Sequence, residues 1–159
     1  MGGCVINENS PDFRCDPCDY SWQKPRPASV PSQFRFFSGG FGGRNTVVTL
    51  VADSLYYETD EHAYPSSEPA VVSPSVTPSK EEWEDFWQLL KDVGFWKWES
   101  AYYDPHILDG HQWEISVGRG RRRKKVHGSN QYPAPRENFD RLLWGIDSIL
   151  FKGELEVIE

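Results

Sequence analysis

One structural plan occurs twice in this chain of 159 residues: a strand, a glycine-containing turn, a second strand and an amphipathic helix. The first copy runs from Phe34 to Gly94 and the second from Gln112 to Gly153. A hairpin with one apolar face and a helix with one apolar stripe bury those sides most simply against each other. The plan therefore predicts an α+β fold (ββαββα) with a four-stranded, mostly antiparallel sheet, covered on one face by two helices.

The expected strands are rich in Val, Thr, Leu, Tyr and Phe, which favour extended backbone. The first pair covers Phe34–Phe37 and Thr46–Glu58, and the glycines between them permit a tight reversal. The third strand alternates apolar and polar residues, and Val126 begins the fourth. The apolar positions of the third strand are Trp113, Ile115 and Val117.

Both expected helices have recognisable ends. Ser79 and Glu82 have capping-box spacing, and Gly94 stands where a glycine ends a helix. Pro135 can occupy the first position of the second helix, and Gly153 ends it. The apolar stripes comprise Trp83, Phe86, Trp87, Leu90 and Val93 in the first helix, and Phe139, Leu142, Leu143, Ile146, Ile149 and Leu150 in the second.

Composition changes along the chain predict its organisation. Residues 1–33 form a short, irregular extension that contains Cys and Pro, and residues 34–153 form the ββαββα domain. Within the domain, residues 59–78 carry Ser, Pro, Glu and Val without a period and predict an exposed, mobile loop. Residues 154–159 are a tail.

A run of positive charge interrupts an acidic chain. The formal net charge is −7, and removing the six cations of the second hairpin leaves −7 − 6 = −13. This acidity argues against a general nucleic-acid binder except at that hairpin. Arg offers forked donors to phosphate or carboxylate, so we expect a protein partner there, with a nucleic acid or phosphate ligand as the alternative. The six residues are Arg119, Arg121, Arg122, Arg123, Lys124 and Lys125.

The first hairpin offers a second recognition tip, at Gly39, Gly40 and Phe41. RNA binding at the basic hairpin would also require exposed aromatic rings beside it. Tyr132 and Trp113 are close in sequence, but the alternation around Trp113 favours a core position. The aromatic cluster of Trp96, Trp98, Tyr102 and Tyr103 could line a groove, although such residues more often close the end of a helix against a sheet.

Cysteine and histidine clusters provide two candidate metal sites. Cys15 and Cys18 have the spacing of half a zinc knuckle, and Cys4 could be a third ligand, but the sequence has no second Cys pair. The alternative is plain thiols. The second cluster could supply a zinc-dependent enzyme with ligands at His106, Asp109 and His111, or form a polar turn before a strand. Its members are Asp104, His106, Asp109, His111 and Glu114.

The expected compartment and partners are inferred from the membrane-spanning and secretory patterns that the sequence does not show. It has no apolar run near the roughly 20 residues that span a bilayer, so no membrane partner is expected. No basic segment followed by an apolar one suggests secretion, and the three cysteines argue against a disulfide-built secreted fold. We therefore expect a cytoplasmic protein.

The Cys segment and the body together resemble a family of uncharacterised bacterial proteins that often begin with a small zinc ribbon. The resemblance implies the hairpin–helix–hairpin–helix body but no activity, and this chain departs from it in lacking the second Cys pair. The matching positions are Gly2, Gly3, Cys4, Pro11, Cys15, Cys18, Trp83, Phe86, Trp96, Trp98, Tyr102, Asp109, Gly110, Trp113, Asn130, Tyr132, Pro133 and Phe139.

The stretch Ser38–Gly43 is similar to the Ser-Gly-Gly-Phe-Ala-Gly hairpin of emfourin-type inhibitors of thermolysin-like metalloproteases, which share the same order of elements. The sequence as a whole predicts a non-enzymatic protein-interaction module that acts through its hairpin tips. A zinc-dependent enzyme, a zinc-ribbon nucleic-acid adaptor and an emfourin-like inhibitor are the alternatives.

Overall fold

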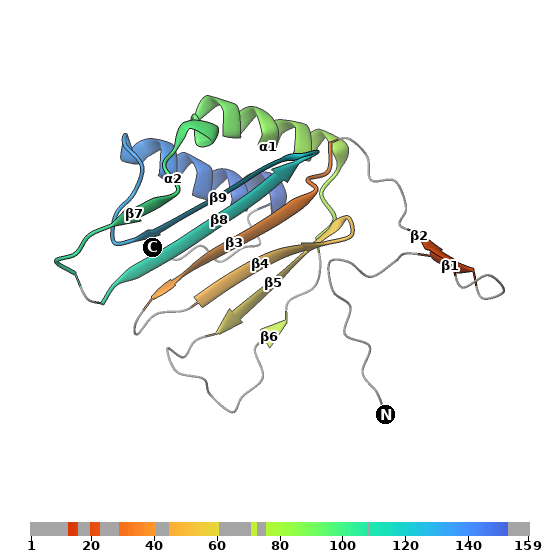
Figure 1. Ribbon diagram of the computed structural model, residues 1–159, viewed down its shortest axis with the longest axis horizontal. Coiled ribbons are helices and arrows are strands. Elements are labelled where there is room, and N and C mark those ends of the chain that lie inside the picture. The colour runs from red at the N-terminus through yellow and green to blue at the C-terminus, as the bar shows by residue number, and fades with distance from the viewer. Residues whose placement is uncertain are drawn as a thin grey trace.

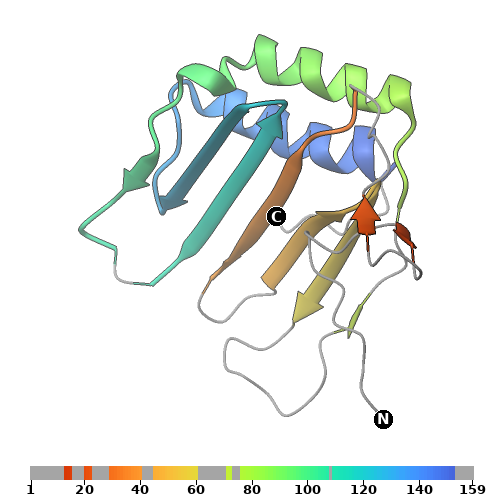
Figure 2. The same ribbon diagram turned by 45° about the vertical axis from the view of Figure 1, so that its right-hand side comes forward.

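A mixed β-sheet with two helices on one face forms the body of the molecule, which confirms the α+β class (Figures 1 and 2). The structure is a computed structural model that describes residues 13–15, 20–22, 29–40, 45–60, 71–72, 76–107 and 109–152. The strands are β1 (Phe13–Cys15), β2 (Tyr20–Trp22), β3 (Gln33–Gly40), β4 (Asn45–Val51), β5 (Ser54–Asp60), β6 (Val71–Val72), β7 (Ala101–Tyr103), β8 (His111–Arg119) and β9 (Arg122–Ser129). The helical elements are α1 (Lys80–Asp92), the 3-10 turn η1 (Phe95–Lys97), α2 (Arg136–Gly145) and the π-helical turn η2 (Ile146–Leu150).

The main sheet is wider than the sequence predicts. In the part of the chain that the structure describes, it has seven strands in the order β6-β5-β4-β3-β8-β9-β7, and β6 contributes only two residues. All neighbours are antiparallel except β7, which runs parallel to β9. Strands β1 and β2 form a separate hairpin within the segment that the sequence predicts to be irregular. The expected four-stranded sheet is therefore wrong in its strand number.

Two local features explain the extra strands. The predicted strand Thr46–Glu58 reverses at Ala52, whose φ of 56° lies in the left-handed region, and becomes the hairpin of β4 and β5. The short strand β7 follows η1 and joins the edge of β9 through backbone hydrogen bonds. The expected loop 59–78 supplies the end of β5, all of β6 and a bridge from Val76 to Leu55, while residues 61–70 and 73–75 lie outside the description.

The helix ends follow the capping chemistry that the sequence predicts, with one shift. Ser79 and Glu82 form a complete capping box at the start of α1, and Gly94, with a φ of 70°, follows its end. Pro135 is the residue before α2 rather than its first residue, and its carbonyl accepts from the amide of Asn138. Helix α2 continues into η2, and the expected stop at Gly153 lies outside the described residues.

The core lies between the sheet and the helices. The apolar stripes of both helices are buried as predicted, apart from Leu143 and Ile149, which are partly buried. On the sheet, the buried apolar residues of β3, β4 and β8 lie at alternate positions, so Phe36 of β3 lies opposite Val48 and Ile115. Among the described residues, no helix has the length and the apolar run that crossing a bilayer requires.

One aromatic contact joins three strands to α2. The indole of Trp113 is buried over Gly128 on the neighbouring strand, and its Nε1 donates to the carbonyl of Gln131 at 3.0 Å. Its ring stacks on Tyr102 of β7 at 6.0 Å between centroids, and lies 4.5 Å from the ring of Phe139 in α2. A side chain on Gly128 would meet the indole at 2.3 Å, so only glycine admits this contact.

We predict that Gly128→Ala lowers the free energy of unfolding by about 3 kcal/mol, because the new methyl group overlaps a buried ring that cannot move. Gly120→Ala is the matched control. Gly120 has a φ of 59° but nothing within 4 Å of an added Cβ, so its substitution is expected to cost only about 1 to 2 kcal/mol of backbone strain. Equal losses in urea denaturation would contradict the placement of the indole.

Candidate functional site

The basic hairpin is the tight turn between β8 and β9. Arg119 and Arg122 are paired across it, so Gly120 and Arg121 form a two-residue turn. Side chains alternate between the two faces of a strand, and this divides the cations that are continuous in sequence. Arg119, Arg122 and Lys124 project to the side of the helices, and Arg123 and Lys125 to the opposite side.

The helix-side cations already have partners in the fold. The guanidinium of Arg119 lies 4.8 Å from the ring centre of Trp87, and that of Arg122 lies 4.1 Å from Trp96. Lys124 Nζ donates to the carbonyls of Trp96 and Trp98. Burial and the nearby Arg122 lower the pKa of the Lys124 ammonium. These three predicted binding residues therefore attach the hairpin to α1 and η1.

The remaining cations gather on the open face, by which we mean the sheet face opposite α1 and α2. Over β3, β8 and β9 its charged side chains are Arg35, Arg123, Lys125 and Glu114, a balance of 3 − 1 = +2. Glu114 accepts from Arg35 and from Lys125, each at 2.8 Å. Burial raises the pKa of Glu114, but these two cations outweigh it and hold the pKa below its ordinary value.

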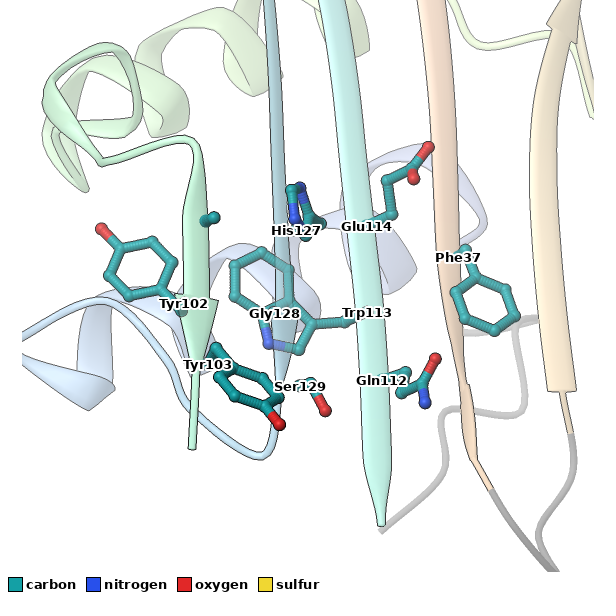
Figure 3. A pocket seen from close by; sticks show the side chains of 10 residues that line it. Phe37, Tyr102, Tyr103, Gln112, Trp113, Glu114, His127, Gly128 and Ser129 are labelled. Carbon is teal, nitrogen blue, oxygen red and sulfur yellow. The ribbon is translucent and has the colours of Figure 1, made fainter. Parts of the chain in front are cut away.

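A shallow hollow of about 400 Å³ lies on the open face beside these charges. Figure 3 shows that its side chains come from four strands, with Phe37 on β3 at one side and Tyr103 on β7 at the other. Tyr103 is 60% exposed. The groups between them are Gln112, Glu114, His127 and Ser129, and the hollow is further lined by Ala101, Tyr102, Trp113 and Gly128.

This hollow combines flat apolar surface with both donors and acceptors. The rings of Phe37 and Tyr103 can pack against a planar ligand. The amide of Gln112 offers a donor and an acceptor, while the carboxylate of Glu114 only accepts. A ligand with a flat ring and polar edges therefore fits the chemistry of the hollow.

A second polar cluster lies on the helix side of the sheet. His111 bridges Ser38 Oγ and Tyr132 Oη, each at 2.8 Å from a ring nitrogen, and its ring stacks on Tyr132. Burial, and then the nearby Arg136 guanidinium, lower the pKa of His111. Its imidazole is therefore neutral near neutral pH, and one of its nitrogens donates while the other accepts. The cluster fixes the ends of β3 and β8 against the segment that leads into α2.

The structure does not bring the expected zinc ligands of the histidine cluster together. The carboxylate of Asp104 accepts from the backbone amide of His106, while both ring nitrogens of His111 have other partners. Across the described ranges, no group of three His, Cys, Asp or Glu residues is arranged to hold a metal ion.

The other predicted site residues fall partly outside the description. Cys15 lies in β1, but Cys4 and Cys18 are outside the described residues, as is Phe41 at the first hairpin tip. Gly39 and Gly40 end β3, and the amide of Gly40 donates to the side chain of Asn45. The knuckle and the first tip therefore stay predictions.

Sequence reasoning missed the hollow. Its members are far apart in sequence, and only the pairing of β3 with β8 and of β7 with β9 brings them together. One signal was present: Phe37 follows Phe36 in a strand, so one of these two large rings must project away from the core.

Comparisons with known proteins add no family. No protein-family model matches this sequence. A search of curated proteins gives no match either. Both resemblances noted from the sequence therefore stay predictions.

We predict that the free energy of unfolding falls as the pH is lowered from about 7.5 to 5.5. The folded pKa of His111 lies below the value of about 6.5 for an unfolded chain, so the unfolded state binds more protons in this range. The stabilisation is complete above about 6.5 and is lost as the pH falls towards the folded pKa.

His111→Gln should flatten this part of a urea-denaturation series, since the titrating group is gone. The control is His127→Gln, which removes an exposed histidine of β9 and should leave the decline in place. A decline of the same size in the His111 variant would show that another group is responsible.

Proposed function

We propose that this protein is a binding module that holds an anionic partner on the open face of its sheet. The observation that carries the proposal is the division of the basic hairpin by strand alternation. It leaves Arg123 and Lys125 on the uncovered side, where Lys125 lies across β8 from Arg35 and beside the hollow.

The distribution of charge supports a site for an anion on the open face and not on the side of α1. Helix α1 carries five acidic and two basic residues, a balance of −3, whereas the open face over β3, β8 and β9 has a balance of +2. Figure 2 shows α1 on the side of the sheet away from this face. A negatively charged ligand is therefore attracted to this part of the sheet and repelled by α1.

Binding is favoured over catalysis because, among the described residues, the Ser38–His111 contact and the carboxylate of Glu114 are already buried or paired. Ser38 and His111 have the separation of a nucleophile and its base, but Ser38 is only 9% exposed and His111 also bonds Tyr132. Glu114 is held as an anion by Arg35 and Lys125, and so is poorly suited to donate a proton.

The test is binding of two labelled polyanions, a single-stranded oligonucleotide and polyglutamate, followed by fluorescence anisotropy at several salt concentrations. The double variant Arg121→Glu with Arg123→Glu should weaken binding at least tenfold at low salt. It should also make the affinity less dependent on salt, because fewer counterions are released.

The matched control is Lys91→Glu with Arg141→Glu. It makes the same change in net charge at exposed positions of α1 and α2 and should change the affinity less than twofold. Equal weakening by both double variants would show a response to net charge alone and would contradict a site on the open face. If the unchanged protein binds neither polyanion, the proposed function fails.

A further inference from the structure

We propose that the anionic partner is a single-stranded nucleic acid, with one base seated in the hollow between Tyr103 and Phe37. This inference rests on the proposed function and gives its ligand a chemical class. It begins from the surroundings of the hollow: on one continuous face, the exposed ring of Tyr103 and the half-buried ring of Phe37 lie beside cations. Proteins that bind single strands combine these same two features.

The aromatic part of the site suits a base that is not stacked in a duplex. Tyr103 is 60% exposed at the edge strand β7, and Phe37 is half-buried two strands beyond β9. Every base has a π-face, so a ring on an open sheet can stack with it whatever the sequence. Bases within a duplex offer no free face. The hollow of about 400 Å³ has room for one such ring.

The polar groups of the hollow favour a nucleic acid over an acidic peptide as the ligand. Glu114 contributes a carboxylate to the hollow and stays ionised through Arg35 and Lys125. An ionised Glu or Asp side chain of a peptide only accepts hydrogen bonds, so it has no donor for this carboxylate. The exocyclic amine of a base instead donates to a carboxylate, and Gln112 can pair with a base edge that has both a donor and an acceptor.

The cations provide a track for the phosphates. Along β9, the open-face positions from the hollow outwards are His127, Lys125 and Arg123, and Arg121 lies in the turn beyond them. Alternate residues of a strand repeat at about 6.6 to 6.8 Å, so Lys125 and Arg123 lie in a row rather than in a cluster. An extended single strand with one base in the hollow can lay its backbone along this row, where Arg binds phosphate oxygens in a forked manner.

The experiment compares three labelled probes by fluorescence anisotropy on the full chain: a single-stranded 12-mer, the duplex of the same sequence, and polyglutamate of equal charge. We expect the single strand to bind at least tenfold more tightly than either other probe. Tyr103→Ala should weaken its binding about tenfold, because base–aromatic stacking is lost, and should leave the salt dependence unchanged because no charge is removed.

Tyr56→Ala is the matched control. Tyr56 is also an exposed tyrosine of the open face, 40% exposed, but it lies on β5 and does not line the hollow. Its removal should change the affinity for the single strand less than twofold. Tyr103→Trp keeps a ring at the site and should retain binding. The thermal midpoints of the three variants verify that each is folded.

The outcomes separate this inference from the proposed function. Polyglutamate could bind tightly, with an affinity that Arg121→Glu with Arg123→Glu lowers and Tyr103→Ala leaves unchanged. This result would support the proposed function and would overturn a nucleic acid as the ligand. Equal binding of the duplex and the single strand would also overturn it, since a duplex cannot place a base in the hollow. Equal effects of the Tyr103→Ala and Tyr56→Ala variants on the affinity for the single strand would contradict the placement of a base beside Tyr103.

Discussion

The packing of Trp113 against Gly128 is the contact on which the rest of the structure depends. Because Gly128 has no side chain, the indole can lie across β9 and stack on Tyr102 of the parallel edge strand. The same ring also contacts Phe139 of α2. Without this contact, β7 would lose its main aromatic anchor. Tyr103, the next residue along β7, would then lose its place at the edge of the hollow.

The alternation of side chains along β8 and β9 is a second constraint. It divides the run of cations into a group that packs against the helix side and a group that is exposed on the open face. On the helix side, the guanidinium groups of Arg119 and Arg122 pack on the rings of Trp87 and Trp96, so these cations contribute to the packing at the edge of the core. On the open face, Arg123 and Lys125 lie in one row along β9, and Arg35 lies across β8 from Lys125. A charge run in a sequence is therefore not one binding site, because the strand that carries it presents only half of its side chains to any ligand.

The sequence predicts most of the helix layer and much less of the sheet. Capping at Ser79 and the helical spacing of Trp83 and Phe86 are local signals, and each is present in the structure. The reversal at Ala52 carries no glycine or proline, and Asp53 and Ser54 are a weak turn signal, so the break between β4 and β5 was not predicted. The parallel pairing of β7 depends on the long-range contact with Trp113, which no local pattern encodes.

The candidate site was predictable only in part, for the same reason. The cations were found because they are adjacent in sequence, whereas Tyr103 and Gln112 meet only through strand pairing. Their separate patterns indicate only an edge residue and a polar strand position. The residues that share the open face can be identified only when the alternation of side chains within each strand is combined with the order of the strands in the sheet.

The central claim is that the ligand lies on the open face around β8 and β9. It is tested most directly by backbone amide spectra, recorded by NMR, of the isotope-labelled chain during titration with a single-stranded oligonucleotide. Binding on the open face should give shift changes concentrated in residues 33–37, 101–103, 112–118 and 121–129, with little change in α1 and α2. Shift changes confined to the helices, or none at ligand excess, would contradict it.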